Sequence, residues 1–503
     1  MKITTLLFVS FILFSNLAIS QSVDDAFSQK KMRKDLAVFK EIRLKANSGL
    51  YKYRTTQQID SIYSWADAEI EQLSTYRDFY NLISTLTDFE GSLHNDTSVP
   101  DRIWQNLRSE KSGYFPLPIK CIEEKWIINY ENGAIPLGAE IVSINEIPFK
   151  EVILNLYKYY TTDGENLTGK KIGIRTHFSR YFRLNYGLKE EFIVRYKLQK
   201  SSEILTKTIA SVSHSNYYKN LQNRYSKSFD DIYYATLTEK QKYNFKKIDS
   251  ETGKLTIYTF DMGDEKAVEH LNYVKFLDSI FIRLKDENIK NLIVDVRQNG
   301  GGTDPNDIVT YSYLTQRNFQ ENKKAWISFK KIPLLKYYNI GAPKFIRPFG
   351  VGKYNKEFQE IFPVEVDNRF YQDENSNDRK IWTPNKNAFN GNVYLLVSPA
   401  IASAGSLFAA MLAGNENTIT VGEETMGGYH GHNGHTSLEY KLPKSKIVTQ
   451  FSVVNLEQDV PKKDNQLLNR GIIPDYKVIQ TYEDYLKQED TQLEFVYDLI
   501  NSK

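Results

Sequence analysis

Cysteine pairs, long apolar runs outside the N-terminus and a strong net charge are all missing from this 503-residue chain. Cys121 is its single cysteine, so the chain cannot form an internal disulfide and its cores have to supply the stability. Basic and acidic residues nearly balance, at 65 against 62, and no long basic run is interleaved with aromatics. The composition therefore gives no support for nucleic-acid binding.

One apolar run does occur, at the very start of the chain. Lys2 supplies a positive charge, Leu6 to Phe14 is apolar, and Ala18-Ile19-Ser20 has the small residues of a cleavage site. This pattern predicts a secretory signal peptide over residues 1–20, which is too short for a stable membrane span. We therefore expect an exported protein, either periplasmic or extracellular.

The body of the chain has enough apolar residues, 41% with 13% aromatics, for sizeable cores. Its length corresponds to about three domains. After the signal peptide, local composition and the spacing of apolar residues predict five regions. They are an N-terminal helical region at 21–110, a β-rich domain at 111–212, a linker or arm at 213–245, an α/β core at 246–482 and a C-terminal helix at 483–503.

The β-rich region has the order strand, glycine-started strand, helix, strand. The strands are KWIINY (125–130), GAEIVSIN (138–145) and EFIVRYKLQ (191–199). This order resembles a PDZ-type peptide-binding module whose characteristic turn opens at Leu137-Gly138, with an insertion from Thr161 to Leu188. A purely structural β domain is the alternative interpretation.

Two segments of the α/β region carry the chemistry. NLIVDVRQNGGG (291–302) and VYLLVSPAIASAGSLFAAMLA (393–413) each begin as a buried strand and break into small residues. The glycines let backbone N–H groups approach a bound oxygen, and Ser403 falls where a helix begins. Together the two breaks predict an oxyanion-binding loop that faces a nucleophilic serine.

The start of a helix favours developing negative charge, because its N–H groups are free and its dipole is positive there. The N–H of Ala404 is a natural oxyanion donor for an attack by Ser403. By itself Ser403 could also be a helix cap, and Ser398 and Ser406 are alternative nucleophiles nearby. The second oxyanion donor is expected from one of the loop glycines, Gly300, Gly301 or Gly302.

Four blocks occur in a fixed order: DVRQNGGG, SPAIASAGSLFAA, VGEETMGGY and NRGIIPDYKV. In this order they resemble the tail-specific, or C-terminal processing, serine peptidase family, which includes the tricorn protease core and the interphotoreceptor retinoid-binding proteins. The resemblance covers roughly 250–480. It implies an α/β catalytic core of the crotonase and Clp-protease ββα-superhelix kind in a chain that is α+β overall. It also implies peptide-bond hydrolysis through an acyl-enzyme on Ser403.

The resemblance also distinguishes two kinds of catalytic base. The processing proteases use a lysine in a GxxTxGKG block, but this chain reads GEETMGGY and has Gly428 at that position, which excludes the Ser–Lys pair. The tricorn-like branch uses a histidine from an upstream block, which falls on His94 in GSLHNDT. A serine directly precedes the histidine in that branch, whereas Leu93 does so here and Ser92 is one position further back.

The family's supporting glutamate, just before NRGIIPD, is replaced by Leu468. Three nearby carboxylates could substitute for it, and the sequence does not choose between Glu457, Asp459 and Asp464.

The segment GGYHGHNGH (427–435) contains three of the seven histidines. His432 with His430 or His435 could bind a metal, since imidazole is a common ligand. No carboxylate or thiol stands beside them at a familiar ligand spacing, so we expect no metal and no cofactor. His430 or His435 is instead an alternative base or a substrate contact, in what could also be an exposed polar loop.

These observations lead to one expected function and one alternative. The expected function is an exported serine endopeptidase that hydrolyses unstructured or C-terminal segments of a polypeptide substrate, with Ser403 as nucleophile and His94 as base. The alternative is a catalytically inactive homologue of the same fold that binds peptides or lipids, because fold does not fix function.

Overall fold

The computed structural model describes residues 22–502 apart from 229–236, 341–350 and 377–378. The predicted signal peptide at 1–20 lies outside the described residues. Within them, none of the helices combines the length and the apolar character that crossing a bilayer requires.

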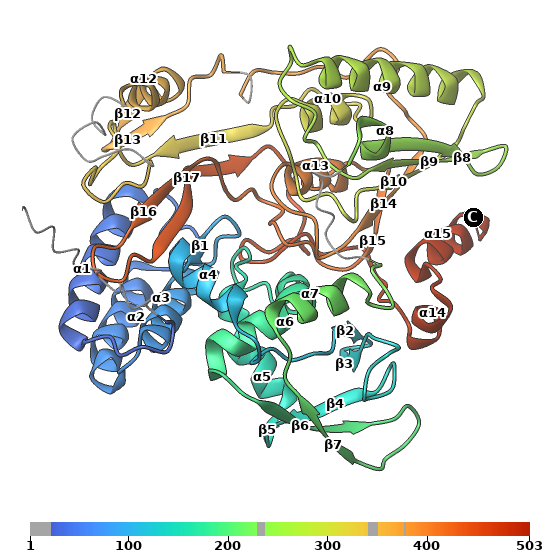
Figure 1. Ribbon diagram of the computed structural model, residues 1–503. Helices are drawn as coiled ribbons and strands as arrows, with labels where there is room; N and C mark the ends of the chain where they lie inside the picture. The colour runs from blue at the N-terminus through green and yellow to red at the C-terminus, as the bar shows by residue number, and fades with distance from the viewer. Residues whose placement is uncertain (1–21, 229–236, 341–350, 377–378, 503) are drawn as a thin grey trace, which may run out of the picture.

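The N-terminal region at 22–110 contains four α-helices: α1 (Gln29–Ala46), α2 (Thr56–Glu69), α3 (Tyr76–Phe89) and, after the His94 segment, α4 (Asp101–Ser109). Thr55 and Thr75 start α2 and α3 with reciprocal capping boxes, which satisfy free N–H groups of the first turn. The periodic apolar face of α3 is buried, including Tyr76, Phe79 and Ile83. This face packs into one core with strands from the far end of the chain, beside which the helices lie in Figure 1.

A six-stranded sheet joins the two ends of the chain. Its order is β1-β17-β11-β13-β12, with β16 paired to β17. The short strand that follows the His94 segment pairs antiparallel with β17, so that Asp96 faces Gln450 and Ser98 faces Val448. The strands are β1 (Asp96–Ser98), β11 (Asn322–Ile327), β12 (Val364–Val366), β13 (Arg369–Tyr371), β16 (Asn433–Lys441) and β17 (Val448–Gln458).

The β-rich region forms a sheet of its own, ordered β2-β3-β4-β6-β7 with β5 paired to β4. The stretch that resembled an insertion contributes a long helix, α6, whose Ile174, Phe178 and Phe182 belong to the core of this region. The elements are β2 (Ile119–Ile122), β3 (Lys125–Ile128), β4 (Glu140–Ile144), β5 (Ile147–Pro148), β6 (Glu191–Lys197), β7 (Leu205–Ala210), α5 (Phe149–Leu156) and α6 (Lys170–Tyr186).

The predicted linker at 213–245 contains structure. Helix α7 (His214–Gln222) follows the β-rich sheet, and its Tyr217 and Leu221 bury themselves against Tyr114. A short helix, α8 (Glu239–Lys242), then leads into the first strand of the catalytic sheet. The polar composition that suggested an arm belongs to the exposed side of these elements.

The third sheet is the α/β core, ordered β18-β15-β14-β10-β9-β8. All its pairs are parallel except β8 with β9. The two apolar runs that mark the chemistry, β10 and β14, are neighbours at its centre, where strands buried on both faces are expected. The strands are β8 (Tyr243–Lys247), β9 (Thr252–Ile257), β10 (Asn291–Asp295), β14 (Asn392–Val397), β15 (Thr418–Gly422) and β18 (Tyr476–Lys477).

Helices cover both faces of this sheet, which confirms the layered α/β prediction. One face packs on α9 (Val268–Asp286), α10 (Asn306–Ser312) and α13 (Ala404–Ala413). The other face packs on α15 (Thr491–Asn501). The predicted single C-terminal helix is two helices, because Gln488 adopts a left-handed conformation after α14 (Tyr482–Lys487), as Figure 1 shows in red.

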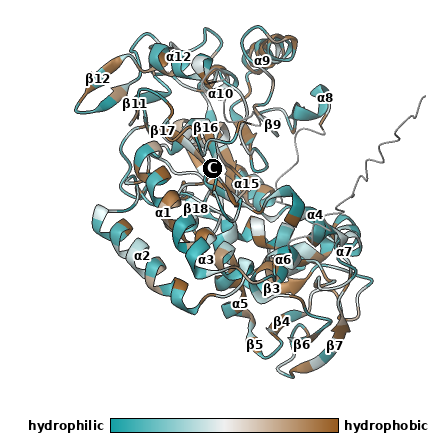
Figure 2. Ribbon diagram, turned by 60° about the vertical axis from the view of Figure 1, so that its left-hand side comes forward, coloured by the Kyte–Doolittle hydropathy of each residue, from teal (hydrophilic) through white to brown (hydrophobic). Residues whose placement is uncertain are grey.

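The long excursion at 317–390 supplies β11 and the hairpin β12–β13 to the antiparallel sheet that contains β1 and β17, and it also contains α12 (Gly352–Ile361). This hairpin is an edge of the molecule, and β12 is coloured as hydrophobic in Figure 2. Val364 and Val366 on it are about half exposed, at 47% and 49%.

Candidate active site

Ser403 lies on a strained turn between a strand and a helix. Strand β14 ends at Val397, and α13 begins at Ala404. Ser403 has φ 51° and ψ −133°, a conformation that costs a residue with a Cβ about 1–3 kcal/mol. In the described structure its side chain makes no capping hydrogen bond to α13, and the residue keeps part of its surface exposed. Such strain at a helix start is characteristic of a nucleophile turn.

The two alternative serines have structural roles. Ser398 is fully buried, and its hydroxyl donates to the Arg297 carbonyl and accepts the Ala400 N–H at 3.1 Å. Ser406 is also fully buried, and its hydroxyl donates to the Ser403 carbonyl at 2.7 Å. Both hydroxyls therefore hold the turn, and neither is accessible to a substrate.

The glycine loop after β10 faces Ser403 closely. A Cβ at Gly301, where φ is +111°, would lie 2.7 Å from Ser403 Cβ and 3.1 Å from the Ala404 nitrogen. Side chains other than hydrogen are thus excluded, both by the backbone conformation and by contact. The predicted approach of loop and serine is present in the fold.

The geometry narrows the choice of oxyanion donors. The Gly301 N–H donates to Asn299 Oδ1 at 2.9 Å, which removes Gly301 from the predicted set. Within the described residues, no hydrogen bond uses the N–H of Gly300, Gly302 or Ala404. These three remain available to a substrate oxygen.

His94 lies in the loop between α3 and β1. The pairing of β1 with β17 brings this loop to β16, where the ring of His94 meets the ring of His432 at 5.2 Å between centroids and 52° between planes. Leu93 also approaches the turn at Gly427, because a Cβ there would lie 3.2 Å from Leu93 Cδ2 and would clash with Ser406 Oγ. The His94 loop and the helix of Ser403 therefore meet at Gly427.

Asp163 ties the His94 loop to the neighbouring turn. One carboxylate oxygen accepts the Leu93 N–H and the other accepts the Gly428 N–H, each at 3.1 Å. Burial raises the pKa of Asp163 to about 7, against the opposing effect of these two bonds. Sequence reasoning missed this residue, because nothing in the 161–188 stretch indicates a contact with His94.

A second buried carboxylate holds the same loop from the other side. Glu90 accepts from Asn95 Nδ2 at 2.7 Å and from Asn47 Nδ2 at 3.1 Å, and it pairs with Arg43 at 3.1 Å. Burial raises the pKa of Glu90 to about 7, with the Arg43 charge acting in the opposite direction. The loop that carries His94 is thus fixed at both ends.

Electrostatics keep His94 neutral. Burial first, and then the charge of His435, lower the pKa of His94 to about 4. The residue is partly exposed, but its Nε2 is enclosed and has no hydrogen-bond partner among the described residues. For His432, burial followed by the charge of His94 lowers the pKa well below its usual value. Both imidazoles are therefore free bases at neutral pH.

The predicted supporting carboxylates lie elsewhere. Asp459 pairs with Arg317 at 2.9 Å, and Glu457 and Asp464 are exposed. In the part of the chain described, no hydrogen bond or ion pair joins any of the three to His94. A histidine, His432, occupies the place beside the His94 ring.

The other histidines of the 427–435 segment diverge. His430 Nε2 contacts the Gln466 carbonyl at 3.2 Å, and His435 is exposed with φ 55°. Among the described residues, the three histidines do not bring their ring nitrogens within 4.8 Å of one another. Ser92 is buried, and its hydroxyl has no hydrogen-bond partner within the described residues. A cavity of about 440 Å³ is lined by His430 together with Lys52, Lys324, Trp326, Asn455, Glu457 and Leu468.

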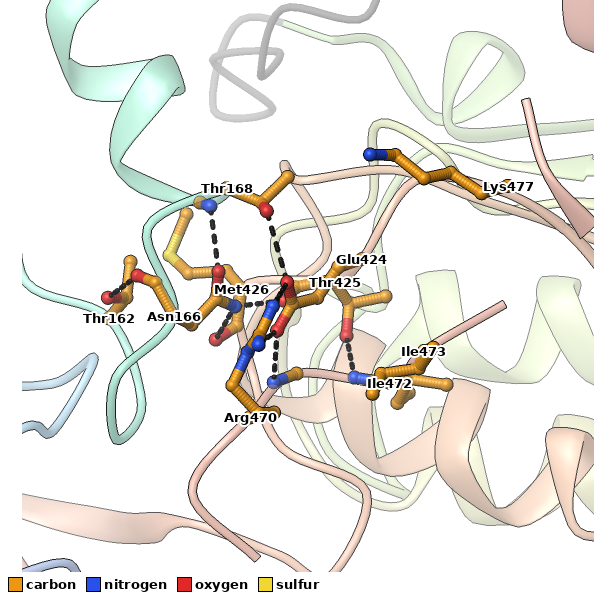
Figure 3. A network of polar contacts seen from close by, with 12 residues as sticks. Thr162, Asn166, Thr168, Glu424, Thr425, Met426, Arg470, Ile472, Ile473 and Lys477 are labelled. Carbon is orange, nitrogen blue, oxygen red and sulfur yellow. Dashed lines mark hydrogen bonds and ion pairs between the residues drawn. The ribbon is translucent and has the colours of Figure 1, made fainter. Parts of the chain in front are cut away.

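A polar network connects the β-rich region to the loops beneath the site (Figure 3). Glu424 accepts from Arg470 Nε at 2.8 Å, from the Gly471 N–H at 3.0 Å and from Thr168 Oγ1 at 3.0 Å. Asn166 donates to the carbonyls of Thr425 and Met426. The VGEETMGGY and NRGIIPD blocks therefore bond directly to each other through Glu424 and Arg470. Thr168 and Asn166, from the stretch that resembled an insertion, bond to the first of these blocks.

The largest cavity described, about 740 Å³, lies in the β-rich region between β4 and α5. Apolar side chains such as Ile141, Phe149 and Ile153 form its floor. Its lining also includes five lysines: Lys125, Lys150, Lys171, Lys197 and Lys477.

Comparison with known proteins gives one family match. Residues 251–478, which include most of the α/β core, match the domain model of Peptidase family S41. By this domain the chain is a serine-type peptidase. No match was found among curated protein sequences.

Several solved structures are similar to the chain at low sequence identity. The structure of mature CPAF complexed with lactacystin is 12% identical, with 94% of this chain and 99% of that chain covered at a TM-score of 0.60. The photosystem II D1 C-terminal processing protease is 12% identical, covering 89% of this chain and 93% of that chain, at a TM-score of 0.36. The tricorn protease is 15% identical, covering 93% of this chain and 36% of that chain, at a TM-score of 0.35. The CPAF likeness shows that nearly the whole chain shares one known architecture.

Proposed function

We propose that this protein is an exported serine endopeptidase in which Ser403 is the nucleophile and His94 is the base. The observation that carries the proposal is the conformation of Ser403. It is the serine held at positive φ at the start of a helix, directly opposite Gly301. A fold keeps such strain where the position of the side chain matters.

In the proposed reaction, the neutral imidazole of His94 takes the proton of the Ser403 hydroxyl as Oγ attacks the scissile carbonyl. The developing oxyanion accepts hydrogen bonds from the Ala404 N–H and from the N–H of Gly300 or Gly302. His94 then gives its proton to the leaving amine. Water repeats the sequence on the acyl-enzyme and releases the second product.

His432 takes a supporting role in this proposal. Its ring packs against His94, and the anchors at Asp163 and Glu90 fix the backbone on either side. The orientation of His94 then comes from packing and from main-chain hydrogen bonds, without a carboxylate on the imidazole. His430 faces the neighbouring cavity, which supports a substrate contact for it more than the role of base.

The substrate class follows from the cavity of the β-rich region, for which we retain the PDZ-like interpretation. An extended peptide lying in the groove between β4 and α5 would place alternate side chains on its apolar lining. Lys171 and Lys477 pair with Glu124, and the other three lining lysines, Lys125, Lys150 and Lys197, favour a terminal carboxylate. We therefore infer that unstructured C-terminal segments are held there and presented to Ser403.

A comparison of three proteins tests the mechanism. Wild type, Ser403→Ala and His94→Ala are incubated with an unstructured protein substrate, with and without a chelator. We expect cleavage by wild type, none by Ser403→Ala, and cleavage by His94→Ala that is slower by about 100-fold or more. Cleavage by Ser403→Ala at the wild-type rate would refute the serine mechanism. A wild type that binds peptides but never cleaves them would identify the inactive binding homologue.

The tail preference and the export have separate tests. A fluorescent peptide with a free C-terminal carboxylate should bind Ser403→Ala more tightly than its C-terminal amide, and Lys150→Ala together with Lys197→Ala should reduce the difference. Equal binding of acid and amide would remove the tail preference. Mass spectrometry of the mature N-terminus, expected at Gln21, tests the signal peptide.

A further inference from the structure

Three carboxylates converge just beyond the glycine loop. Asp304 lies in the turn that follows Gly302, Asp307 in the first turn of α10, and Glu321 directly before β11. One oxygen from each lies within 4.8 Å of the others. Three separate segments thus bring negative charge to one point near the predicted oxyanion loop.

Asp307 is the unexplained member of this cluster. Its side chain is fully buried, and both carboxylate oxygens lack a hydrogen-bond donor among the described residues. A buried carboxylate without a donor or a counter-ion is costly, so its retention indicates a positive partner.

We propose that Asp304, Asp307 and Glu321 bind a divalent cation of the hard, oxygen-preferring class, with calcium as the best fit. The ligands are all carboxylate oxygens, which calcium and magnesium prefer over the transition metals. Two oxygens bound to one calcium ion lie at most about 5 Å apart, which the cluster satisfies. Two of the three residues are fully buried, which disfavours the several waters that magnesium keeps.

The position of the site indicates that a bound cation would stabilise the turn after the glycine loop. The turn between Gly302 and α10 is held by the Thr303 N–H on the Phe260 carbonyl at 3.1 Å and by Asn306 Nδ2 on the Thr303 carbonyl at 2.6 Å. A cation bound by Asp304 and Asp307 fixes the same turn to the start of β11. Its effect is to stiffen the loop whose N–H groups face Ser403, and it takes no part in the proton transfers.

Thermal unfolding tests this site without relying on activity. The full-length mature chain carrying Ser403→Ala, which prevents self-cleavage, is freed of metals with EDTA and titrated with Ca²⁺, Mg²⁺ or Mn²⁺. We expect Ca²⁺ to raise the Tm saturably, by about 3 to 5 °C, and to do so at lower concentration than Mg²⁺. Calorimetric titration should give one calcium per chain.

Asp307→Asn on the same background should lose the calcium-dependent rise. It should also unfold at a higher Tm than its parent in EDTA, because one repelling charge is gone. Asp286→Asn, which changes an exposed carboxylate on α9, is the matched control and should keep the full calcium response. The proposal is overturned if none of the ions produces a saturable shift, or if Asp307→Asn responds as its parent does. In the first case the carboxyl groups share protons and hold no metal.

Discussion

Ser403, the proposed nucleophile, holds a strained backbone conformation. Its positive φ is imposed by the turn between β14 and α13, where the Asn299 carbonyl approaches Gly405 and accepts the Ala402 N–H at 3.3 Å. The strained conformation persists because the contacts of the surrounding loops leave Ser403 no other backbone conformation. The hydroxyl is thereby presented to solvent and not to its own helix.

Replacing this serine should therefore separate stability from activity. Both Ser403→Ala and Ser403→Gly should abolish peptide cleavage. The unfolding free energy of Ser403→Gly should exceed that of Ser403→Ala by about 1 kcal/mol. Glycine adopts the turn without strain, and this gain outweighs the additional chain entropy that glycine loses on folding. Chemical denaturation of the two variants measures the difference. A glycine variant less stable than the alanine variant would contradict a strained turn.

His94 makes a prediction about pH. Because its pKa is lowered to about 4, the imidazole stays neutral and basic well below the usual titration range of histidine. We expect kcat/KM to decline below pH 7, where Asp163 and Glu90 take up protons and loosen the His94 loop, and to be lost fully only near pH 4, as His94 itself is protonated. Complete loss of activity by pH 6 would argue against the lowered pKa of His94.

A matched variant sharpens that experiment. His435 is exposed, and its charge lowers the pKa of His94. His435→Gln should therefore move the acidic limb toward higher pH without abolishing cleavage. No movement would show that burial alone sets the value.

At the scale of elements, the site depends on loops that meet without sharing a secondary structure. Asp163 lies outside both the His94 loop and the Gly427–Gly428 turn, yet it accepts one N–H from each. The Asp163 carboxylate thus connects the two loops by hydrogen bonds, as backbone hydrogen bonds connect two paired strands. The relative position of these loops is consequently sensitive to one side chain.

Asp163→Asn should misplace the loops while leaving the fold intact. The amide can accept the Leu93 N–H, but its NH₂ group then faces the Gly428 N–H, donor against donor. We expect kcat to fall by about 100-fold with little change in KM, because a small displacement of the base affects chemistry more than binding. Steady-state kinetics measure the split. Glu165→Gln, an exposed neighbour, is the control and should behave as wild type.

At the scale of the whole molecule, the N-terminal helices and the catalytic strands form one unit. Arg43 of α1 is fully buried, stacks on Phe451 of β17 at 4.4 Å and donates to Thr449 at 2.7 Å. Its ion pair with Glu90 is buried as well, at 3.1 Å. The buried guanidinium of Arg43 thus connects the first third of the chain, where it pairs with Glu90, to the last third, where it contacts Thr449 and Phe451.

Arg43→Ala should destabilise the entire chain. It leaves Glu90 buried without its counter-ion, a change that typically costs about 3–5 kcal/mol of unfolding free energy. Lys45→Ala, which removes an exposed pair with Glu41 on the same helix, should cost less than about 0.5 kcal/mol. Denaturant unfolding compares the two. If Arg43→Ala unfolded in two steps, with only the N-terminal helices unfolding earlier, the N-terminal helices and the catalytic strands would not share one cooperative core.

Much of the candidate site was predictable from local sequence. Buried strands that end in glycines or in Ser403 are encoded in a few adjacent residues, and the gap of about a hundred positions was bridged by the rule that central parallel strands are neighbours. The role of α6 in the β-rich core was not predictable, because its helical face is interrupted by polar residues and only packing shows what it covers.

The sequence by itself determined the peptidase class, the α/β core, the glycine loop and the serine on the turn, because each depends on contacts between residues close in the chain or in adjacent strands. Only the tertiary structure decided what surrounds the base. The pairing of β1 with β17 sets His432 beside His94, Asp163 ties the two loops, and Gly301 turns its N–H inward to Asn299. These arrangements join residues up to several hundred positions apart, and no local pattern encodes them.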